Sequence, residues 1–200
     1  MIVEEYKSKY SKKLIVKKIW DWGWHYYVTT GVLTQSGGLI NDIWSKVLSA
    51  QKKVLRGNNF LILGLATGTV AKIINKKFKD AEITGIEIDP MMIEIGKEYF
   101  DLDKIPNLKI LIADANEYKP KEKFDLVLVD LYINDAPPRF LYSYQFLKKI
   151  NQWGKHVIIN HLFYDEDKKQ KAHVLIKRLD KYFQKIRLNH VLTNVMIICE

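Results

Sequence analysis

A turn of small residues follows directly on an apolar run in the middle of the chain. The run Phe60 to Leu65 leads into Gly64-Leu65-Ala66-Thr67-Gly68-Thr69. Small residues at such a turn let the backbone come close to a ligand, and the helix that follows aims its N-terminus at that ligand. A dinucleotide fingerprint would place glycine at position 69, so the spacing favours a nucleoside without a pyrophosphate. The alternative is a tight connection between strand and helix that binds nothing.

The next apolar run ends in Glu87, and Asp89 and Pro90 come directly after it. A carboxylate at the tip of the neighbouring strand can accept two hydrogen bonds from a ribose diol, each worth roughly 1.5–3 kcal/mol. Asp89 before Pro90 is also typical of a helix N-terminus. We therefore expect Glu87 to bind the ribose and Asp89 to cap the helix beside it.

Two further apolar runs end in aspartate. Asp114, followed by Ala115, is placed to accept a hydrogen bond from an adenine amino group, although a surface loop would also explain it. In an open parallel sheet the ligand lies outside the carboxyl ends of the strands, so we expect Asp130 to face the reaction chamber. Asp130, or Tyr132 or Asp135 in the loop behind it, could position or deprotonate an acceptor.

The acidic residues and the glycine turn lie at the ends of apolar strands that alternate with helices. Nearly continuous apolar strands indicate a parallel sheet covered by helices on both faces, and the short spacing of the last two strands indicates an antiparallel hairpin at one edge. The expected fold class is α/β, with a mostly parallel seven-stranded Rossmann-like sheet. The predicted strands are Phe60–Leu65, Glu82–Ile88, Leu108–Ala113, Phe124–Leu131, His156–Asn160, Lys185–His190 and Thr193–Cys199, and the predicted helices are Thr69–Phe78, Pro90–Phe100, Pro138–Ile150 and Asp167–Phe183.

The first part of the chain has a different pattern. Leu14 to Trp20 and Trp24 to Thr30 are β-branched and aromatic runs separated by a short turn, which predicts a β-hairpin. We therefore divide the chain into an N-terminal β-hairpin region, residues 1–37, and an α/β domain, residues 38–200. An extended piece is predicted over Val32–Thr34 and a helix over Ile40–Leu55.

The composition is that of a globular protein with a basic surface. The net charge is +9, and six lysines fall between Lys7 and Lys18. A basic arm for nucleic acid or another acidic partner is one interpretation, but a solvated lysine-rich surface is favoured because arginine, the better reader of phosphates and bases, is scarce.

The single cysteine, Cys199, excludes a disulfide within the chain and a cysteine-based metal site. The histidines show no metal-ligand spacing either, so no metal is expected. The first residues lack the apolar core of a signal peptide, and no run is long enough to cross a membrane. We expect a cytoplasmic protein with no membrane partner.

Taken together, these motifs resemble the spermidine synthase-like proteins, the polyamine aminopropyltransferase branch of the class I S-adenosylmethionine-dependent methyltransferase superfamily. The resemblance runs from about Leu14 to Asn160 and includes the extended piece around Gln35, the glycine turn and the acidic tips. It implies a Rossmann-like methyltransferase fold and a small-molecule nucleoside cosubstrate, either S-adenosylmethionine or its decarboxylated form. The cosubstrate-binding residues that it implies are Gln35, Gly64, Ala66, Thr67, Gly68, Glu87, Asp89, Asp114, Ala115 and Asp130.

Two positions depart from the aminopropyltransferase pattern. Thr67 stands where those enzymes carry an aspartate that anchors the aminopropyl ammonium, and Ile133 stands where they carry a second acid after Asp130. We therefore predict a methyltransferase with an unknown acceptor. The alternatives are a polyamine aminopropyltransferase that uses decarboxylated S-adenosylmethionine, and a non-catalytic nucleoside-binding protein. The resemblance also implies a homodimer joined through the N-terminal strands.

Overall fold

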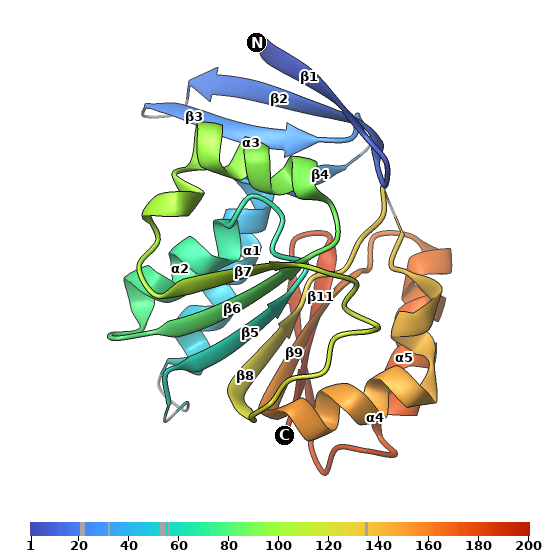
Figure 1. Ribbon diagram of the computed structural model, residues 1–200. Helices are drawn as coiled ribbons and strands as arrows, with labels where there is room; N and C mark the ends of the chain where they lie inside the picture. The colour runs from blue at the N-terminus through green and yellow to red at the C-terminus, as the bar shows by residue number, and fades with distance from the viewer. Residues whose placement is uncertain (21–22, 32, 53–54, 56, 135) are drawn as a thin grey trace.

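The computed structural model describes residues 1–20, 23–31, 33–52, 55, 57–134 and 136–200, and these form two β-sheets with helices around them (Figure 1). Several positions in the predicted elements and site lie outside the described residues: Asp21 and Trp22 of the hairpin turn, Val32 of the extended piece, Val54 of the predicted helix and the candidate acid Asp135.

The larger sheet has seven strands in the order β10-β11-β9-β8-β5-β6-β7. The five strands from β9 to β7 run parallel, whereas β11 is antiparallel to both β9 and β10. The predicted mostly parallel seven-stranded sheet is confirmed. Its strands are β5 (Asn59–Leu63), β6 (Glu82–Glu87), β7 (Leu108–Ile112), β8 (Phe124–Val129), β9 (Gly154–Leu162), β10 (Ile186–Val191) and β11 (Asn194–Cys199).

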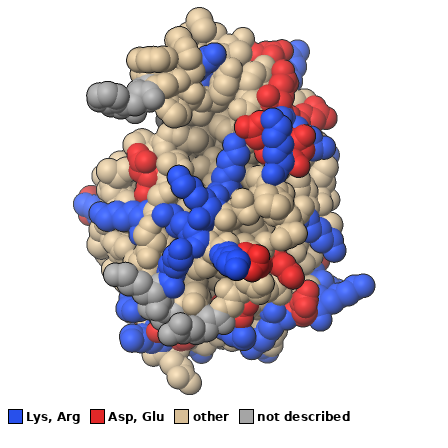
Figure 2. Space-filling view, turned by 90° about the vertical axis from the view of Figure 1, so that its left-hand side faces the viewer, with Lys and Arg blue, Asp and Glu red and all other residues tan. Residues whose placement is uncertain are grey.

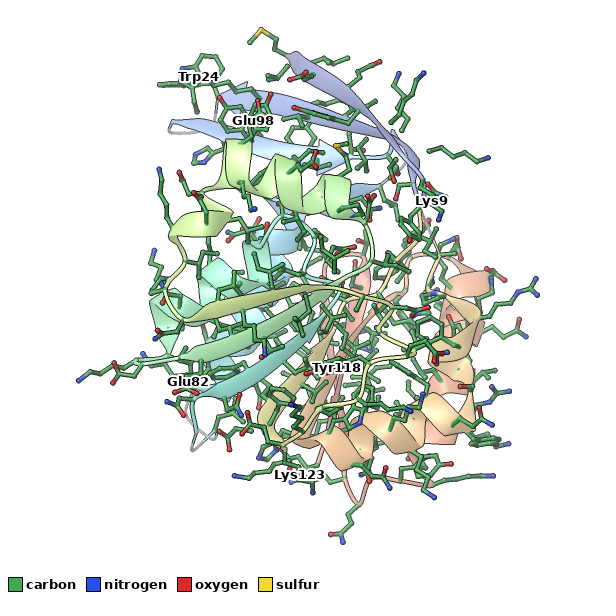
Figure 3. All side chains as sticks on the ribbon, in the orientation of Figure 1. Lys9, Trp24, Glu82, Glu98, Tyr118 and Lys123 are labelled. Atoms are coloured by element: carbon green, nitrogen blue, oxygen red, sulfur yellow. The ribbon has the colours of Figure 1, made fainter. Side chains whose placement is uncertain are left out.

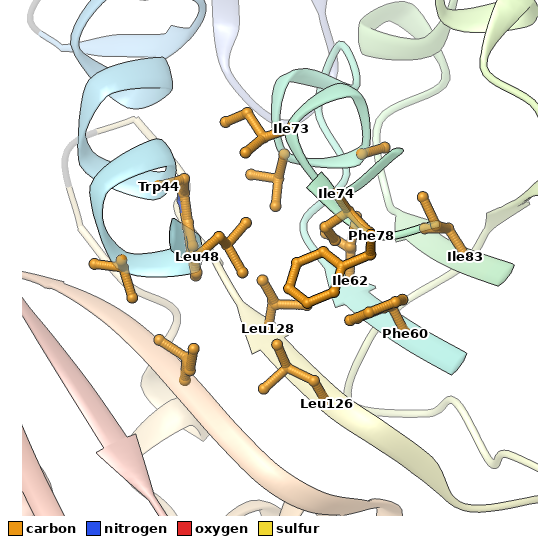
Figure 4. Close-up of a cluster of buried hydrophobic side chains, with 14 of the residues drawn as sticks. Trp44, Leu48, Phe60, Ile62, Ile73, Ile74, Phe78, Ile83, Leu126 and Leu128 are labelled. Atoms are coloured by element: carbon orange, nitrogen blue, oxygen red, sulfur yellow. The ribbon is translucent and has the colours of Figure 1, made fainter. Parts of the chain in front are cut away.

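Side chains of this sheet alternate between two apolar layers. On one face, Phe60 and Ile62 of β5 pack with α1 (Gly38–Gln51) and α2 (Thr69–Lys77), as Figure 4 shows. On the other face, Leu61 of the same strand belongs to a cluster with α4 (Tyr144–Trp153) and α5 (Glu166–Leu179). Burial on both faces explains why the strand is apolar throughout.

The smaller sheet lies above the larger one in Figure 1 and has four antiparallel strands in chain order. Its inner face packs against α3 (Pro90–Phe100), where Leu14, Val16 and Val28 meet Met92 and Ile95. The strands are β1 (Ile2–Ser8), β2 (Lys12–Trp20), β3 (Trp24–Thr29) and β4 (Thr34–Ser36).

One predicted helix is shorter than expected. Instead of a helix over Pro138–Ile150, the chain forms a 3-10 turn at Arg139–Tyr142 and then begins α4 at Tyr144. The break follows from capping, because the Ser143 hydroxyl accepts a hydrogen bond from the backbone N–H of Phe146 and so marks a new N-terminus. A second 3-10 turn, Leu102–Lys104, follows α3. None of the helices described has the length and apolar character that crossing a bilayer requires.

Candidate functional site

A cavity of about 310 Å³ opens at the carboxyl ends of the parallel strands. This volume lies at the small end of the range for ligand sites. The cavity is lined by residues from β4, from α1 and from the carboxyl ends of the five parallel strands, and by the turn between β1 and β2. Most of the predicted site residues line it: Gln35, Gly64, Ala66, Glu87, Asp89, Asp114, Ala115, Asp130 and Tyr132.

Glu87 is held at the tip of β6 by backbone donors. Its Oε2 accepts a hydrogen bond from Ala66 N at 2.7 Å, and its Oε1 accepts from Ile88 N and Asp89 N at 2.9 and 3.0 Å. Burial raises the pKa of the Glu87 carboxyl, and the three backbone donors oppose that rise. Each carboxylate oxygen can accept more than one hydrogen bond, so Glu87 is oriented and retains acceptor capacity for a ligand hydroxyl.

The glycine turn brings β5 and β8 close together. Gly64 has a φ of 88°, and a Cβ there would come within 2.2 Å of the carbonyl oxygen of Asp130. Only glycine fits both the left-handed backbone and the close approach. Ala66 also has a positive φ of 48°, and its N–H donates to Glu87. The turn thus joins the tips of β5, β6 and β8 into one wall of the cavity.

Asp89 is the predicted helix cap and lies almost completely buried. Its Oδ1 accepts from the backbone N–H of Met91 in the first turn of α3, and its Oδ2 accepts from the hydroxyl of Ser8. Ser8 in turn accepts from the N–H groups of Tyr10 and Ser11, both of which line the cavity. The turn between β1 and β2, in which Figure 3 labels Lys9, is therefore fastened to the cavity wall.

Asp114 and Ala115 follow β7 at the far end of the cavity from β8. The Oδ1 atom of Asp114 accepts a hydrogen bond of 2.8 Å from Asn116 N, an arrangement that fixes the side chain in a turn. Asp114 is half-buried and faces the cavity, while Ala115 is buried. An amino group on a bound ligand would find a free carboxylate oxygen at this position.

Thr67 and Gly68 do not line the cavity among the described residues. The Thr67 side chain is fully buried, and its hydroxyl donates to Ser36 Oγ at 2.6 Å. Ser36 and Thr69 share a further hydrogen bond of 2.8 Å. Gly68 has a φ of 90° and leads into α2. Thr67 therefore connects β4 to the glycine turn, and direct binding by its side chain stays a prediction.

Asp130 is the centre of a polar network at the tip of β8. Its Oδ2 accepts from Trp44 Nε1 at 2.7 Å, and its Oδ1 accepts from Asn160 Nδ2 at 2.9 Å. Asn194 donates in turn to Asn160 Oδ1 at 2.8 Å. Burial raises the pKa of the Asp130 carboxyl, against the two hydrogen bonds that lower it. A fixed carboxylate with a raised pKa is a better general base than an ordinary aspartate.

Tyr132 and Gln35 complete the wall next to this network. The Tyr132 hydroxyl donates to the carbonyl oxygen of Asn160 at 3.0 Å. Burial and the nearby charge of Asp130 raise the pKa of Tyr132 well above its ordinary value, so it serves as a neutral hydrogen-bonding group. Gln35 donates to the carbonyl oxygen of Asn134 at 2.6 Å and so holds β4 against the loop after β8.

The cavity wall is negative although the protein is basic. Figure 2 shows basic side chains gathered on one face of the molecule, but none of the described residues that line the cavity is lysine, arginine or histidine. The charged residues there are Glu87, Asp89, Asp114 and Asp130. Nowhere in the described part of the chain do three or more histidine, cysteine, aspartate or glutamate side chains form a metal-binding group. Such a wall suits a ligand that carries positive charge.

Sequence reasoning missed the partners of the acidic residues. Trp44 lies in the helix predicted over Ile40–Leu55, which assigns it no part in the site, yet its indole N–H donates to Asp130, 86 positions further along the chain. Asn160, Asn194 and Ser8 carry no local motif. The two asparagines lie within or at the end of an apolar strand, a signal that does not name a partner, and Ser8 ends the mostly exposed strand β1 without even that signal.

Comparison with known proteins agrees with this geometry. Residues 60–149 match the family model described as a methyltransferase domain. This segment is similar to a methyltransferase domain over a little under half of the chain. It contains the glycine turn, Glu87, Asp114 and Asp130, while the N-terminal sheet and the last three strands lie outside the match.

Curated proteins that are similar to this chain include both kinds of transferase. A polyamine aminopropyltransferase of Sulfurisphaera tokodaii is 34% identical over 107 residues, which is 47% of this chain and 35% of the relative. A malonyl-[acyl-carrier protein] O-methyltransferase of Ilyobacter polytropus is 33% identical over 92 residues, 44% of this chain and 34% of the relative. The match therefore spans about a third of the length of these relatives.

Solved structures extend the likeness to the N-terminal sheet. A probable spermidine synthase of Corynebacterium glutamicum matches with a TM-score of 0.77 over 100% of this chain and 80% of its own, at 15% identity. Human methyltransferase-like protein 13, solved in complex with SAH, matches with a TM-score of 0.66 over 82% of both chains, at 21% identity. The spermidine synthase likeness covers the whole chain, so the predicted α/β fold preceded by an N-terminal hairpin region is confirmed, with β1 added to the predicted hairpin.

Proposed function

We propose that this protein is a methyltransferase that uses S-adenosylmethionine. The observation that carries the proposal is the row of groups along one cavity wall, from Asp114 through Glu87 and the glycine turn to Asp130. Their order follows the order of the strands β7, β6, β5 and β8. An adenosyl ligand laid along this row has its adenine at Asp114, its ribose at Glu87 and its sulfonium near Asp130.

The donor groups fit such a ligand. Glu87 is oriented by three backbone N–H groups and can accept from the ribose hydroxyls. A wall whose charged groups are carboxylates attracts a sulfonium cation through space. When bound, S-adenosylmethionine supplies an activated methyl group, and the protein's part is to orient the acceptor in line and exclude water. Asp130, held by Trp44 and Asn160, is the group placed to take the acceptor proton.

A polyamine aminopropyltransferase is the second candidate, and one observation favours it. Decarboxylated S-adenosylmethionine lacks the carboxylate of the methyl donor, and the described cavity wall offers no basic side chain to such a carboxylate. Against this candidate, the hydroxyl of Thr67 is bound to Ser36, so that position offers nothing to an aminopropyl ammonium. Backbone N–H groups of the glycine turn can serve the carboxylate of S-adenosylmethionine.

Calorimetric titration with S-adenosylmethionine, its decarboxylated form and methylthioadenosine tests the assignment. We expect S-adenosylmethionine to bind at least tenfold more tightly than the decarboxylated form. Tighter binding of the decarboxylated form would instead favour a polyamine aminopropyltransferase. If none of the three ligands bound, both candidates would be overturned. The expected compartment is the cytoplasm, since the single thiol, Cys199, is buried and unpaired.

A further inference from the structure

The cavity has a second half that the proposed nucleoside does not use. The adenosyl row ends at the tip of β8, and the sheet continues through β9 and β11. Asn160 and Leu162 of β9, and Thr193 and Asn194 beside β11, line the cavity beyond that row. With the proposed ligand in the adenosyl row, this part of the cavity adjoins its sulfonium and would take the acceptor.

Besides Asn160, Thr193 and Asn194, the wall of this second half has apolar side chains that come from separate segments. Leu33 and Leu39 approach from the N-terminal side, and Ile133 and Phe140 from the segment after β8. Leu39 is 52% exposed and Ile133 is 40% exposed, so both side chains have apolar surface that a ligand could cover. An apolar body that covers them removes this surface from water, which favours binding.

The charges of this half discriminate between acceptors. Asp130 is the only carboxylate among its described residues. Its oxygens accept hydrogen bonds from Trp44 and Asn160 and keep the capacity to receive one acceptor hydroxyl. An ammonium elsewhere on the acceptor, placed against the leucine and phenylalanine side chains and away from Asp130, would lose its water without gaining a counter-ion, and burying an unpaired charge is costly. An anionic acceptor would meet Asp130 and no basic side chain of the described wall.

We infer that this half of the cavity is an acceptor site for a neutral molecule with an apolar body and a single hydroxyl nucleophile. The inference rests on the proposed methyltransferase function. The apolar body packs against Leu39, Ile133 and Phe140, and the hydroxyl lies at the polar network of Asp130, Tyr132 and Asn160.

The transfer step balances with the groups in place. The acceptor oxygen uses a lone pair to bond the methyl carbon, the carbon–sulfur bond breaks, and its electron pair stays on sulfur to leave a neutral thioether. The acceptor proton passes to the Asp130 carboxylate and from there to solvent, which leaves a neutral methyl ether. The Tyr132 hydroxyl donates to Asn160, so its oxygen is free to accept a hydrogen bond and hold the acceptor hydroxyl.

Three phenols that differ in the charge of the para substituent test the inference, and only their binding needs to be measured. The probes are 4-ethylphenol (neutral), tyramine (cationic) and 4-hydroxyphenylacetate (anionic), each titrated at pH 7.5 into the full chain saturated with S-adenosylhomocysteine. We expect 4-ethylphenol to bind at least tenfold more tightly than either charged probe. Equal or tighter binding of tyramine overturns the inference, and so does binding of none of the three by a protein that binds S-adenosylhomocysteine. Failure to bind S-adenosylhomocysteine instead removes the proposed function itself.

Ile133 offers a matched pair of variants for the same series. Ile133→Asp places a carboxylate in the apolar wall, and Ile133→Asn makes a change of similar size without the charge. We expect Ile133→Asp to shift the preference at least tenfold toward tyramine and Ile133→Asn to weaken 4-ethylphenol without that shift. An unchanged preference in Ile133→Asp would mean that this residue does not face the acceptor.

Discussion

Glu87→Gln separates a binding role of this residue from a structural one. Glutamine keeps the shape of the side chain but replaces one acceptor oxygen with a donor. At Oε1 the new amide would face the N–H groups of both Ile88 and Asp89, so it will lie at the Oε2 position, opposite Ala66 N alone. One backbone donor is then left without a partner, which costs about 1–3 kcal/mol of stability.

The stability loss is partly offset, because burial raises the pKa of Glu87 and removing the charge relieves that desolvation. The loss of binding free energy for S-adenosylmethionine has no such offset. A ribose hydroxyl loses a charge-assisted hydrogen bond worth about 1.5–3 kcal/mol, so the Kd for S-adenosylmethionine should rise roughly 10- to 150-fold.

Calorimetry measures the Kd, and thermal unfolding measures stability on the same samples. The control is Glu82→Gln, an identical substitution at the exposed start of the same strand (Figure 3), which should leave both values unchanged. A Glu87→Gln protein that unfolds earlier but binds within threefold of the wild type would refute the reasoning, because Glu87 would then serve only the backbone turn.

Two further predictions concern groups away from the acidic row. Ser8→Ala removes the acceptor for two backbone N–H groups and the donor to Asp89. The binding free energy for S-adenosylmethionine should therefore weaken by about 1–2 kcal/mol, which raises the Kd roughly 5- to 30-fold. Ser49→Ala on the exposed face of α1 is its control, and equal affinities would contradict the role of the turn. His161 has a pKa lowered mainly by burial, and this predicts that the free energy of unfolding falls as the pH drops below about 6.5, because the unfolded state binds the proton more readily. Chemical denaturation at pH 7.5 and 5.5 should show a smaller difference in His161→Gln than in the wild type or in His173→Gln, and equal differences would contradict the assignment.

The sequence predicted the parts of the fold that depend on local patterns. β5 and β8 are apolar at nearly every position because both of their faces are buried, and such runs are easy to recognise. β1 was not predicted, because it is an edge strand whose residues are mostly exposed and alternate without an apolar face. The same reasoning explains the missed helix break at Ser143, where one hydroxyl decides the boundary.

The sequence predicted the site residues that lie at the ends of strands and helices, but it did not predict the side chains that bind them. Glu87 and Asp89 follow from the end of a strand and the start of a helix, which are sequence-local features. Thr67 occupies the expected turn, but its hydroxyl turns to Ser36, and a turn motif does not say which way a side chain points. Trp44 and Asn160 reach Asp130 from elements far away in the chain, so only the folded sheet could show that they belong to the site.

The division into residues 1–37 and 38–200 describes the sequence pattern, but the cavity crosses it. Three contacts tie the N-terminal sheet to the strand tips: Ser8 to Asp89, Ser36 to Thr67, and Gln35 to the carbonyl of Asn134. Each of the three ends at, or next to, a residue of the cavity wall. The N-terminal strands therefore contact both halves of the site: Ser8 binds next to the ribose position, and Gln35 binds next to the acceptor position. Because the apolar face of these strands also packs on α3, movement of the sheet would alter cosubstrate and acceptor binding together, and this coupling makes the N-terminal sheet part of the proposed enzyme.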